Sequence, residues 1–211
     1  MYGETRIWLL TPSRPCGTVK RFYPSQVRES GGAPMAERAR RSSNGSYLTS
    51  PGVAYALTTV RERMEMIAQA DWAADLEWGE VVRIAQFFDA CTVKAGTVVF
   101  REGDREAYMC LLISGRAEVR KRSPDAVTDK VISTIHRGKT FGEMSMIDGE
   151  PRSATVLATE DSTVLVLTKH NFARLTEECP RLVLRMVLRM YRQASQHLRA
   201  MNLALVEHLE T

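Results

Sequence analysis

Residues 139–156 read KTFGEMSMIDGEPRSATV, and this stretch is the most informative part of the chain. The triplet FGE at 141–143 opens it, and the run PRSAT at 151–155 closes it. Between them, the apolar spacing from Met144 to Ile147 indicates about one helical turn. Gly142 permits a close backbone approach or a positive φ angle. The pattern predicts a loop between two strands, built around a short helix.

The charged residues of this loop suit a ligand that carries one phosphate and one ribose. Arg152 has a planar guanidinium that can bind a phosphate through two parallel hydrogen bonds. Glu143 is an acceptor that suits ribose hydroxyls. The N–H groups at the start of the short helix favour an anion. In the alternative interpretation, Glu143 and Arg152 form a salt bridge that only fastens the loop, as exposed charge pairs commonly do.

The loop resembles the phosphate-binding cassette of cyclic nucleotide-binding domains, which occur in the catabolite activator protein and in regulatory subunits of cyclic AMP-dependent kinase. The shared pattern is Phe-Gly-Glu, seven residues, then Pro-Arg-x-Ala-Thr, and this chain matches it without a gap. The resemblance extends over residues 78–202 and includes the turns EGD at 102–104, SG at 114–115 and Gly138. Because the full motif is present, ligand binding is favoured over a purely structural salt bridge.

The resemblance implies a role for each residue of the site. Glu143 would bind the ribose 2′-hydroxyl, Arg152 the cyclic phosphate, and backbone N–H groups around Gly142 and Ser153-Ala154 would complete the cradle. A C-terminal helix would close over the base and move on binding. The expected ligand-binding residues are Phe141, Gly142, Glu143, Met144, Arg152, Ser153, Ala154, Thr155 and, near the base, His197.

The expected ligand is cAMP, with cGMP as the alternative. The residue after Arg152 is Ser153, where some cyclic GMP-selective members have Thr and many cyclic AMP binders have Ala. The predicted function is a regulatory sensor that signals to a protein effector through its C-terminal helix. The alternative is a structural interaction module of the same fold that binds no nucleotide. The sequence contains no nucleophile motif, P-loop or zinc-ligand spacing, so we expect neither an enzyme nor a metal site.

The apolar pattern divides the chain into regions. Helical periodicity from about residue 55 to 74 and from 76 to 88 predicts N-terminal helices over 51–88. Short β-branched runs separated by Gly or charged turns predict a sandwich or barrel over 89–168, with the cassette at 141–155. The resemblance makes this an antiparallel β jelly roll, also called a double-stranded β-helix. Helices are predicted again over 169–211.

Residues 1–50 are expected to form a disordered or loosely attached basic arm. This region is rich in Gly, Pro, Ser and Arg, and it carries eight Lys/Arg against three Asp/Glu. A spurious start before Met35 is the alternative, because Gly31-Gly32 can be encoded by a purine-rich ribosome-binding sequence. The remaining residues are close to neutral, so charge gives no support for nucleic-acid binding by the whole domain.

The cysteine pattern and the lack of an export signal predict a cytoplasmic protein with reduced thiols. Cys16, Cys91, Cys110 and Cys179 are widely spaced and form no C-x-x-C pair. No apolar run reaches the length that a membrane helix needs. Because the sequence ends at Thr211, shortly after the last helix, we expect no helix-turn-helix and no sequence-specific DNA binding.

The last helix is predicted to have two apolar faces. A heptad seam runs along one of them, through Leu184, Leu188, Tyr191, Ser195, Leu198, Asn202, Leu205 and Leu209. The other face carries Val183, Met186, Val187, Met190 and Ala194. The seam predicts a parallel homodimer, and the alternative is a monomer in which both faces pack within the chain. The arginines at 181, 185, 189 and 192 are interpreted as a solvated face.

Overall fold

The structure, a computed structural model, describes residues 47–122 and 129–209, apart from several side chains of the last helix. Residues 1–46 of the expected arm therefore lie outside the described residues. The remainder of that arm, residues 47–50, belongs to the folded domain, since Leu48 is buried and packs in the β core. The described residues all belong to one compact unit.

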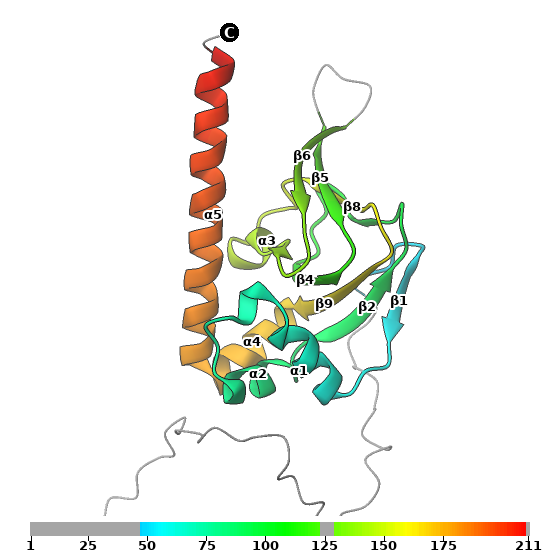
Figure 1. Cartoon of the computed structure of the whole chain (residues 1–211), viewed down its shortest axis with the longest axis vertical. Coiled ribbons are helices and arrows are strands. Elements are labelled where there is room, and N and C mark those ends of the chain that lie inside the picture. The colour runs from blue at the N-terminus through cyan, green and yellow to red at the C-terminus, as the bar shows by residue number, and fades with distance from the viewer. Residues whose placement is uncertain (1–46, 123–128, 210–211) are drawn as a thin grey trace, which may run out of the picture. The chain divides into compact units, whose positions relative to one another are not determined.

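Two antiparallel sheets form the centre of the fold (Figure 1). The five-stranded sheet has the order β1-β2-β9-β4-β7, and the four-stranded sheet has the order β3-β8-β5-β6. The strands are β1 Val53–Ala56, β2 Asp89–Val93, β3 Val98–Phe100, β4 Tyr108–Ser114, β5 Ala117–Lys121, β6 Lys130–Ile135, β7 Thr140–Phe141, β8 Thr155–Ala158 and β9 Ser162–Thr168. This arrangement confirms the predicted jelly roll with flanking helices.

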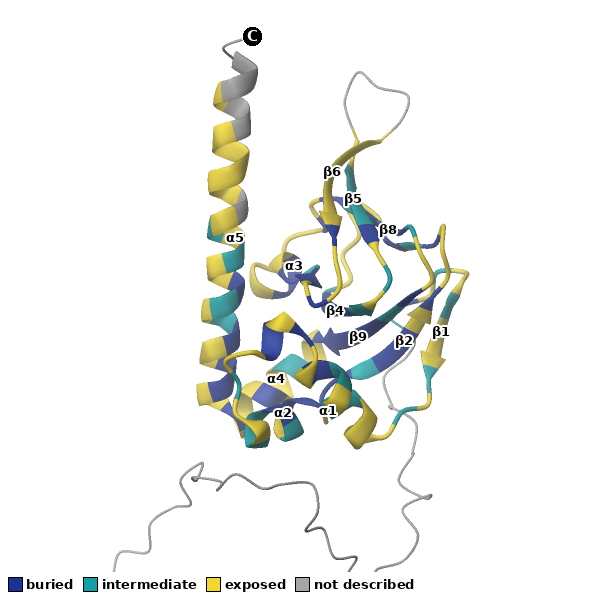
Figure 2. Ribbon diagram, viewed as in Figure 1, coloured by how far each residue is buried: buried dark blue, intermediate teal, exposed yellow. Residues whose placement is uncertain are grey.

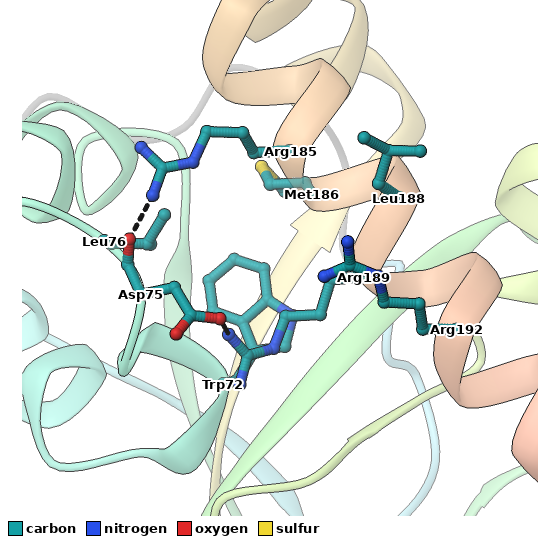
Figure 3. A pocket seen from close by; sticks show the side chains of 8 residues that line it. All are labelled: Trp72, Asp75, Leu76, Arg185, Met186, Leu188, Arg189 and Arg192. Atoms are coloured by element: carbon teal, nitrogen blue, oxygen red, sulfur yellow. Dashed lines mark hydrogen bonds and ion pairs between the residues drawn. The ribbon is translucent and has the colours of Figure 1, made fainter.

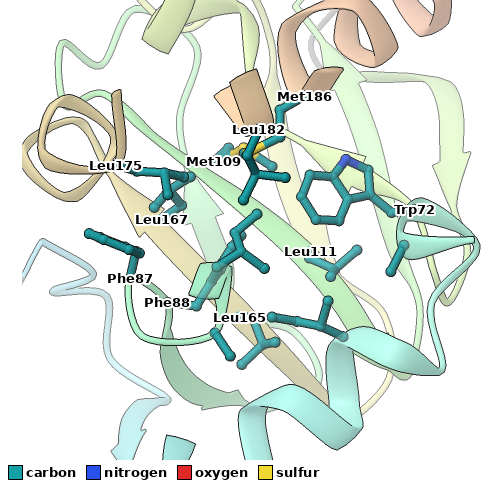
Figure 4. Close-up of a cluster of buried hydrophobic side chains, with 14 of the residues drawn as sticks. Trp72, Phe87, Phe88, Met109, Leu111, Leu165, Leu167, Leu175, Leu182 and Met186 are labelled. Atoms are coloured by element: carbon teal, nitrogen blue, oxygen red, sulfur yellow. The ribbon is translucent and has the colours of Figure 1, made fainter. Parts of the chain in front are cut away.

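The central strands are buried on both faces, which explains the continuous apolar run at residues 164–167 in the middle of β9. Along β9, Leu165 and Leu167 point into a core shared with the helices, whereas Val164 and Val166 point into the interior of the β domain. This alternation follows from the two-residue period of a strand. The first core is completed by side chains from the helices (Figure 4).

The N-terminal helices are shorter than the sequence pattern suggested. They are α1 Val60–Ala68, the 3-10 helix η3 Asp71–Ala73 and α2 Trp78–Ile84. The first helix was expected from about Tyr55, but residues 53–56 are a strand paired with β2. The helix begins at Val60 because Thr59 caps it, with its side chain accepting from the Glu62 N–H and the Glu62 carboxylate accepting from the Thr59 N–H.

The chain ends in two helices, α4 Lys169–Glu178 and α5 Pro180–Leu209. One face of α5 is buried in the helix-side core through Leu182, Val183, Met186 and Met190. The other face of α5 and most of the described residues in its C-terminal half are exposed (Figure 2). Within the described ranges, no helix is long and apolar enough to cross a membrane. The remaining helix, α3 Met144–Ile147, lies between β7 and β8 in the predicted cassette.

Candidate functional site

The predicted cassette connects the two sheets. It begins in β7, passes through α3 and enters β8, so its two ends belong to different sheets. The turn at residues 101–104 holds the second end: the Gly103 N–H donates to the Arg152 carbonyl, and the Arg152 N–H donates to the Asp104 carbonyl, each at 2.8 Å. The Glu102 N–H donates to the Thr155 hydroxyl at 3.0 Å. These bonds fix the backbone on both sides of the Arg152 side chain.

Arg152 is a buried cation whose hydrogen bonds are only partly used. Its side chain is 3% exposed, and its guanidinium carbon lies 4.0 Å from the ring centre of Phe100 and 4.3 Å from that of Tyr108. Nη1 donates to the Gly142 carbonyl at 2.6 Å and to the Ser145 hydroxyl at 2.7 Å. Nε and Nη2 have no hydrogen-bond partner among the described residues.

The unused atoms lie on the edge of the guanidinium that binds oxyanions. Nε–H and one Nη2–H point in the same direction, and this pair forms two parallel bonds to a carboxylate or phosphate. Burial lowers the pKa of Arg152, but an arginine side chain remains protonated in proteins. A buried charge is costly unless it is paired, so the free edge favours an anionic ligand.

Gly142 is required where the cassette leaves β7. Its φ angle is +77°, a region that favours glycine. A Cβ at this position would lie 2.7 Å from Arg152 Nη1 and 3.1 Å from both the Phe100 ring and the Tyr108 carbonyl. The glycine therefore serves both purposes expected from the sequence, an unusual dihedral angle and a close approach.

The neighbours of Gly142 are buried on both sides. Phe141 packs against Phe100 with ring centres 6.0 Å apart, which anchors the end of β7 in the β core. Glu143 is 8% exposed and lies at the N-terminal end of α3. The structure thus brings Glu143 and Arg152 into one buried region. Met144 is 52% exposed, so it is not a core residue, whereas Met146 is buried.

The closing run of the cassette is more open. Ser153 is exposed, and its carbonyl accepts a hydrogen bond from Lys121 Nζ at 2.7 Å, while Ala154 is buried. The Thr155 hydroxyl already accepts from the Glu102 N–H, so Thr155 holds the turn at 101–104. His197 lies on α5, and its side chain is outside the described part of the structure.

Three residues around Arg152 were missed by sequence reasoning: Phe100, Tyr108 and Ser145. Phe100 and Tyr108 come from β3 and β4, far from the cassette along the chain, and no sequence signal pairs them with Arg152. Ser145 lies inside the quoted motif, where a hydroxyl in an otherwise apolar helical turn was a usable signal. The described residues contain no group of His, Cys, Asp and Glu that could hold a metal ion.

Two of the α5 arginines that were interpreted as a solvated face also form ion pairs within the protein. Arg185 Nη1 binds both carboxylate oxygens of Glu80 at 2.7 Å, and its Nη2 donates to the Asp75 carbonyl. Arg189 forms an ion pair with the Asp75 carboxylate at 2.9 Å and donates to the Asp71 carbonyl. The side chains fasten α5 to the segment containing η3 and α2 (Figure 3).

Comparison with known proteins agrees with this geometry. Residues 90–179 match the model of the family "Cyclic nucleotide-binding domain", which confirms the resemblance seen in the cassette. A solved cyclic nucleotide-binding domain from Methylobacillus flagellatus KT has a TM-score of 0.62 and 25% identity, covering 71% of this chain and 85% of that one.

Two curated relatives contain a similar segment. The rat patatin-like phospholipase domain-containing protein 7 is 28% identical over 113 residues, which is 54% of this chain. The regulatory subunit of cAMP-dependent protein kinase from Aspergillus niger is 33% identical over 96 residues, or 46% of this chain. The matched segments span only 8% and 22% of these relatives.

Proposed function

We propose that this chain, whose residues 90–179 form a cyclic nucleotide-binding domain, is a regulatory module that binds cAMP at the cassette and transmits binding to a partner protein through α5. The observation that carries the proposal is the buried guanidinium of Arg152, with Nε and Nη2 unpartnered among the described residues. The cyclic phosphate has one negative charge and can accept two bonds from that edge. The cytoplasmic location remains a prediction from the sequence.

Different residues of the cassette would bind different parts of the ligand. Arg152 supplies the charge, and its fixed stacking on Phe100 and Tyr108 keeps the guanidinium oriented before the ligand arrives. Glu143 lies at the start of α3, where the resemblance assigns it to the ribose 2′-hydroxyl. The exposed Ser153 hydroxyl is available to the ligand. We favour cAMP, with cGMP as the second candidate ligand.

The proposal is tested by isothermal titration of the full chain with cAMP, cGMP and a cyclic dinucleotide. We expect one site per chain and the tightest binding for cAMP. Arg152→Lys keeps the positive charge but removes the two-bond edge, so affinity should fall by at least about tenfold. Charge reversal at Arg152 is a poorer test, because it would bury a carboxylate between two aromatic rings.

Glu143→Gln is the companion variant, since it keeps the size of the side chain and removes its charge. Weaker binding in both variants, with cooperative thermal unfolding retained, would support the assigned site. Unchanged affinity in Arg152→Lys, or no heat with any nucleotide for the wild type, would reject the proposal.

A structural interaction module that binds no nucleotide is the second candidate. One observation favours it: Arg152 Nη1 is already bonded to Gly142 and Ser145, so part of the guanidinium serves the protein's own loop. In that case no nucleotide would raise the melting temperature of the wild type.

A further inference from the structure

The long helix α5 is basic on one side and contains no acidic residue over most of its length. Residues 180–206 include five arginines and no Asp or Glu. Arg185 and Arg189 are paired with the chain's own carboxylates. The other three, Arg181, Arg192 and Arg199, are exposed and make no ion pair within the described residues. The chain thus presents positive charges on α5 without balancing them.

These charges run beside an exposed apolar stripe. Leu184, Leu188, Tyr191 and Leu198 are 60%, 46%, 69% and 60% exposed, on the side of α5 that does not pack on the domain. They occupy the seam positions of a heptad repeat. Arg185, Arg192 and Arg199 each follow a seam residue by one position, so all three lie on the same flank of the stripe.

A groove lies beside the arginine flank and could hold a polar side chain of the partner. It has a volume of about 270 Å³ and is lined by Leu188 and Arg192 on one side and by Trp72 and Asp75 on the other (Figure 3). Trp72 is 4% exposed, and its indole N–H has no hydrogen-bond partner among the described residues. A buried indole N–H normally has a partner. A carboxylate that entered the groove would face Arg192.

We propose that α5 docks an acidic amphipathic helix of another protein. The partner's apolar residues cover the stripe from Leu184 to Leu198, and its carboxylates lie along the flank at the unpaired Arg192 and Arg199. The inference rests on the proposed function in one respect only: the acidic helix would belong to the protein effector to which the regulatory module signals. Docking itself requires no nucleotide.

Charge favours this partner over a second copy of the chain. In a parallel homodimer, the residues that face the arginine flank are Val187, Ala194 and Met201, which offer no negative charge. In an antiparallel pair, the arginine flank would face the same flank of the other copy. Opposite charges beside an apolar seam are the usual determinant of partner choice in paired helices.

The test uses two synthetic peptides of four heptads, each with Leu at the seam positions and with either Glu or Lys on both flanks. Binding of fluorescent peptide to the full chain is measured by anisotropy. We expect the Glu peptide to bind the wild type and the Lys peptide to bind at least about tenfold more weakly. In the charge-swapped variant Arg192→Glu, Arg199→Glu, the preference should reverse.

Two further variants separate position from net charge. Arg192→Gln, Arg199→Gln removes two positive charges from the flank, and Gln196→Glu, Ala200→Glu adds two negative charges away from the seam. Only the first should weaken binding of the Glu peptide. If both double variants lost the same affinity for the Glu peptide, the effect would depend only on net charge, and the proposal would be overturned.

Three other results would also overturn it. The wild type could bind neither peptide, or form a homodimer in light scattering that the Glu peptide does not dissociate. It could also bind phosphatidylserine vesicles from which the Glu peptide does not displace it. Titration of the same sample with cAMP tests the proposed function separately, so the two can fail independently.

Discussion

Gln193 and Thr140 hydrogen-bond to each other twice, and this pair joins α5 to the strand that leads into the cassette. The Thr140 hydroxyl donates to Gln193 Oε1 at 3.1 Å, and Gln193 Nε2 donates to the Thr140 carbonyl at 3.2 Å. Thr140 is buried and directly precedes Phe141. The side-chain amide of Gln193 therefore holds both the side chain and the backbone of Thr140, the residue just before the cassette.

The first prediction is that Gln193→Ala weakens both the fold and ligand binding. The variant leaves the Thr140 hydroxyl buried without its partner, which should cost about 1–3 kcal/mol in the free energy of unfolding. Because the start of the cassette is less well fixed, affinity for cAMP should fall about three- to tenfold. Urea unfolding and titration calorimetry give the two values.

Position 140 provides the matched controls. Thr140→Ser keeps the hydroxyl and should retain most of the affinity, whereas Thr140→Val keeps the shape and should behave like Gln193→Ala. Equal affinities in the Ser and Val variants would show that the pair plays no part in binding.

The second prediction compares two glycines with almost the same backbone angle. Gly142 and Gly149 have φ angles of +77° and +76°, but a Cβ meets Arg152 Nη1 at 2.7 Å in the first case and nothing within 4 Å in the second. Gly149→Ala should therefore cost only the strain of a left-handed residue, about 1–2 kcal/mol.

Gly142→Ala should cost more, since the guanidinium of Arg152 or the backbone must also shift. We expect a loss larger by about 1–3 kcal/mol and at least about tenfold weaker nucleotide binding. Thermal unfolding and calorimetry of both variants decide the matter. If the two alanines have the same effect, the close approach at Gly142 has no energetic importance.

The cassette could be predicted from the sequence because its parts are neighbours along the chain. Gly142 and Arg152 lie ten residues apart, and the motif carries their spacing directly. The aromatic rings under Arg152 could not be found this way. Phe100 and Tyr108 reach it only because β3 and β4 belong to different sheets that face each other, and that pairing is set by the complete fold.

The start of the first helix shows a second limit. Tyr55 and Leu57 fit a helical period, but residues 53–56 gain hydrogen bonds by pairing with β2, and the Thr59 cap begins the helix later. The local periodicity of residues 55–74 carries no information about β2, the strand with which residues 53–56 pair. Likewise, the ion pairs of Arg185 and Arg189 could not be predicted from the helix alone, because their acceptors, Glu80 and Asp75, come from an earlier segment.

The third prediction concerns two buried thiols in alkaline solution. Cys91 and Cys110 are fully buried; burial raises the pKa of Cys91 to about 12 and also raises the pKa of Cys110. In the unfolded chain a thiol has a pKa near 8.5. Above that pH the unfolded chain releases these protons and the folded chain keeps them, so stability is complete below about pH 8.5 and falls as the pH rises toward 12.

Each thiol should contribute a slope of up to about 1.4 kcal/mol per pH unit. The measurement is the free energy of unfolding by urea at pH 8, 9 and 10, with Cys91→Ala, Cys110→Ala as the control. The control should show a flatter decline even if it is less stable overall. An identical slope would contradict protonation of these thiols in the folded state.

The last prediction concerns Tyr47, which the sequence assigned to the arm. Its hydroxyl donates to the Asp89 carboxylate at the start of β2, and its ring lies 5.5 Å from that of Tyr55 and 6.0 Å from that of Tyr108. Tyr108 is one of the two rings that hold Arg152. Tyr47→Ala should thus lower stability by about 3 kcal/mol and also weaken cAMP binding, because the support beneath Tyr108 is lost. Tyr47→Phe keeps the ring and removes only the bond to Asp89, so it should cost about 1 kcal/mol and leave the affinity nearly unchanged. Urea unfolding and calorimetry of the two variants separate these effects. A Tyr47→Ala protein as stable as the wild type would show that Tyr47 does not contribute to the folded domain.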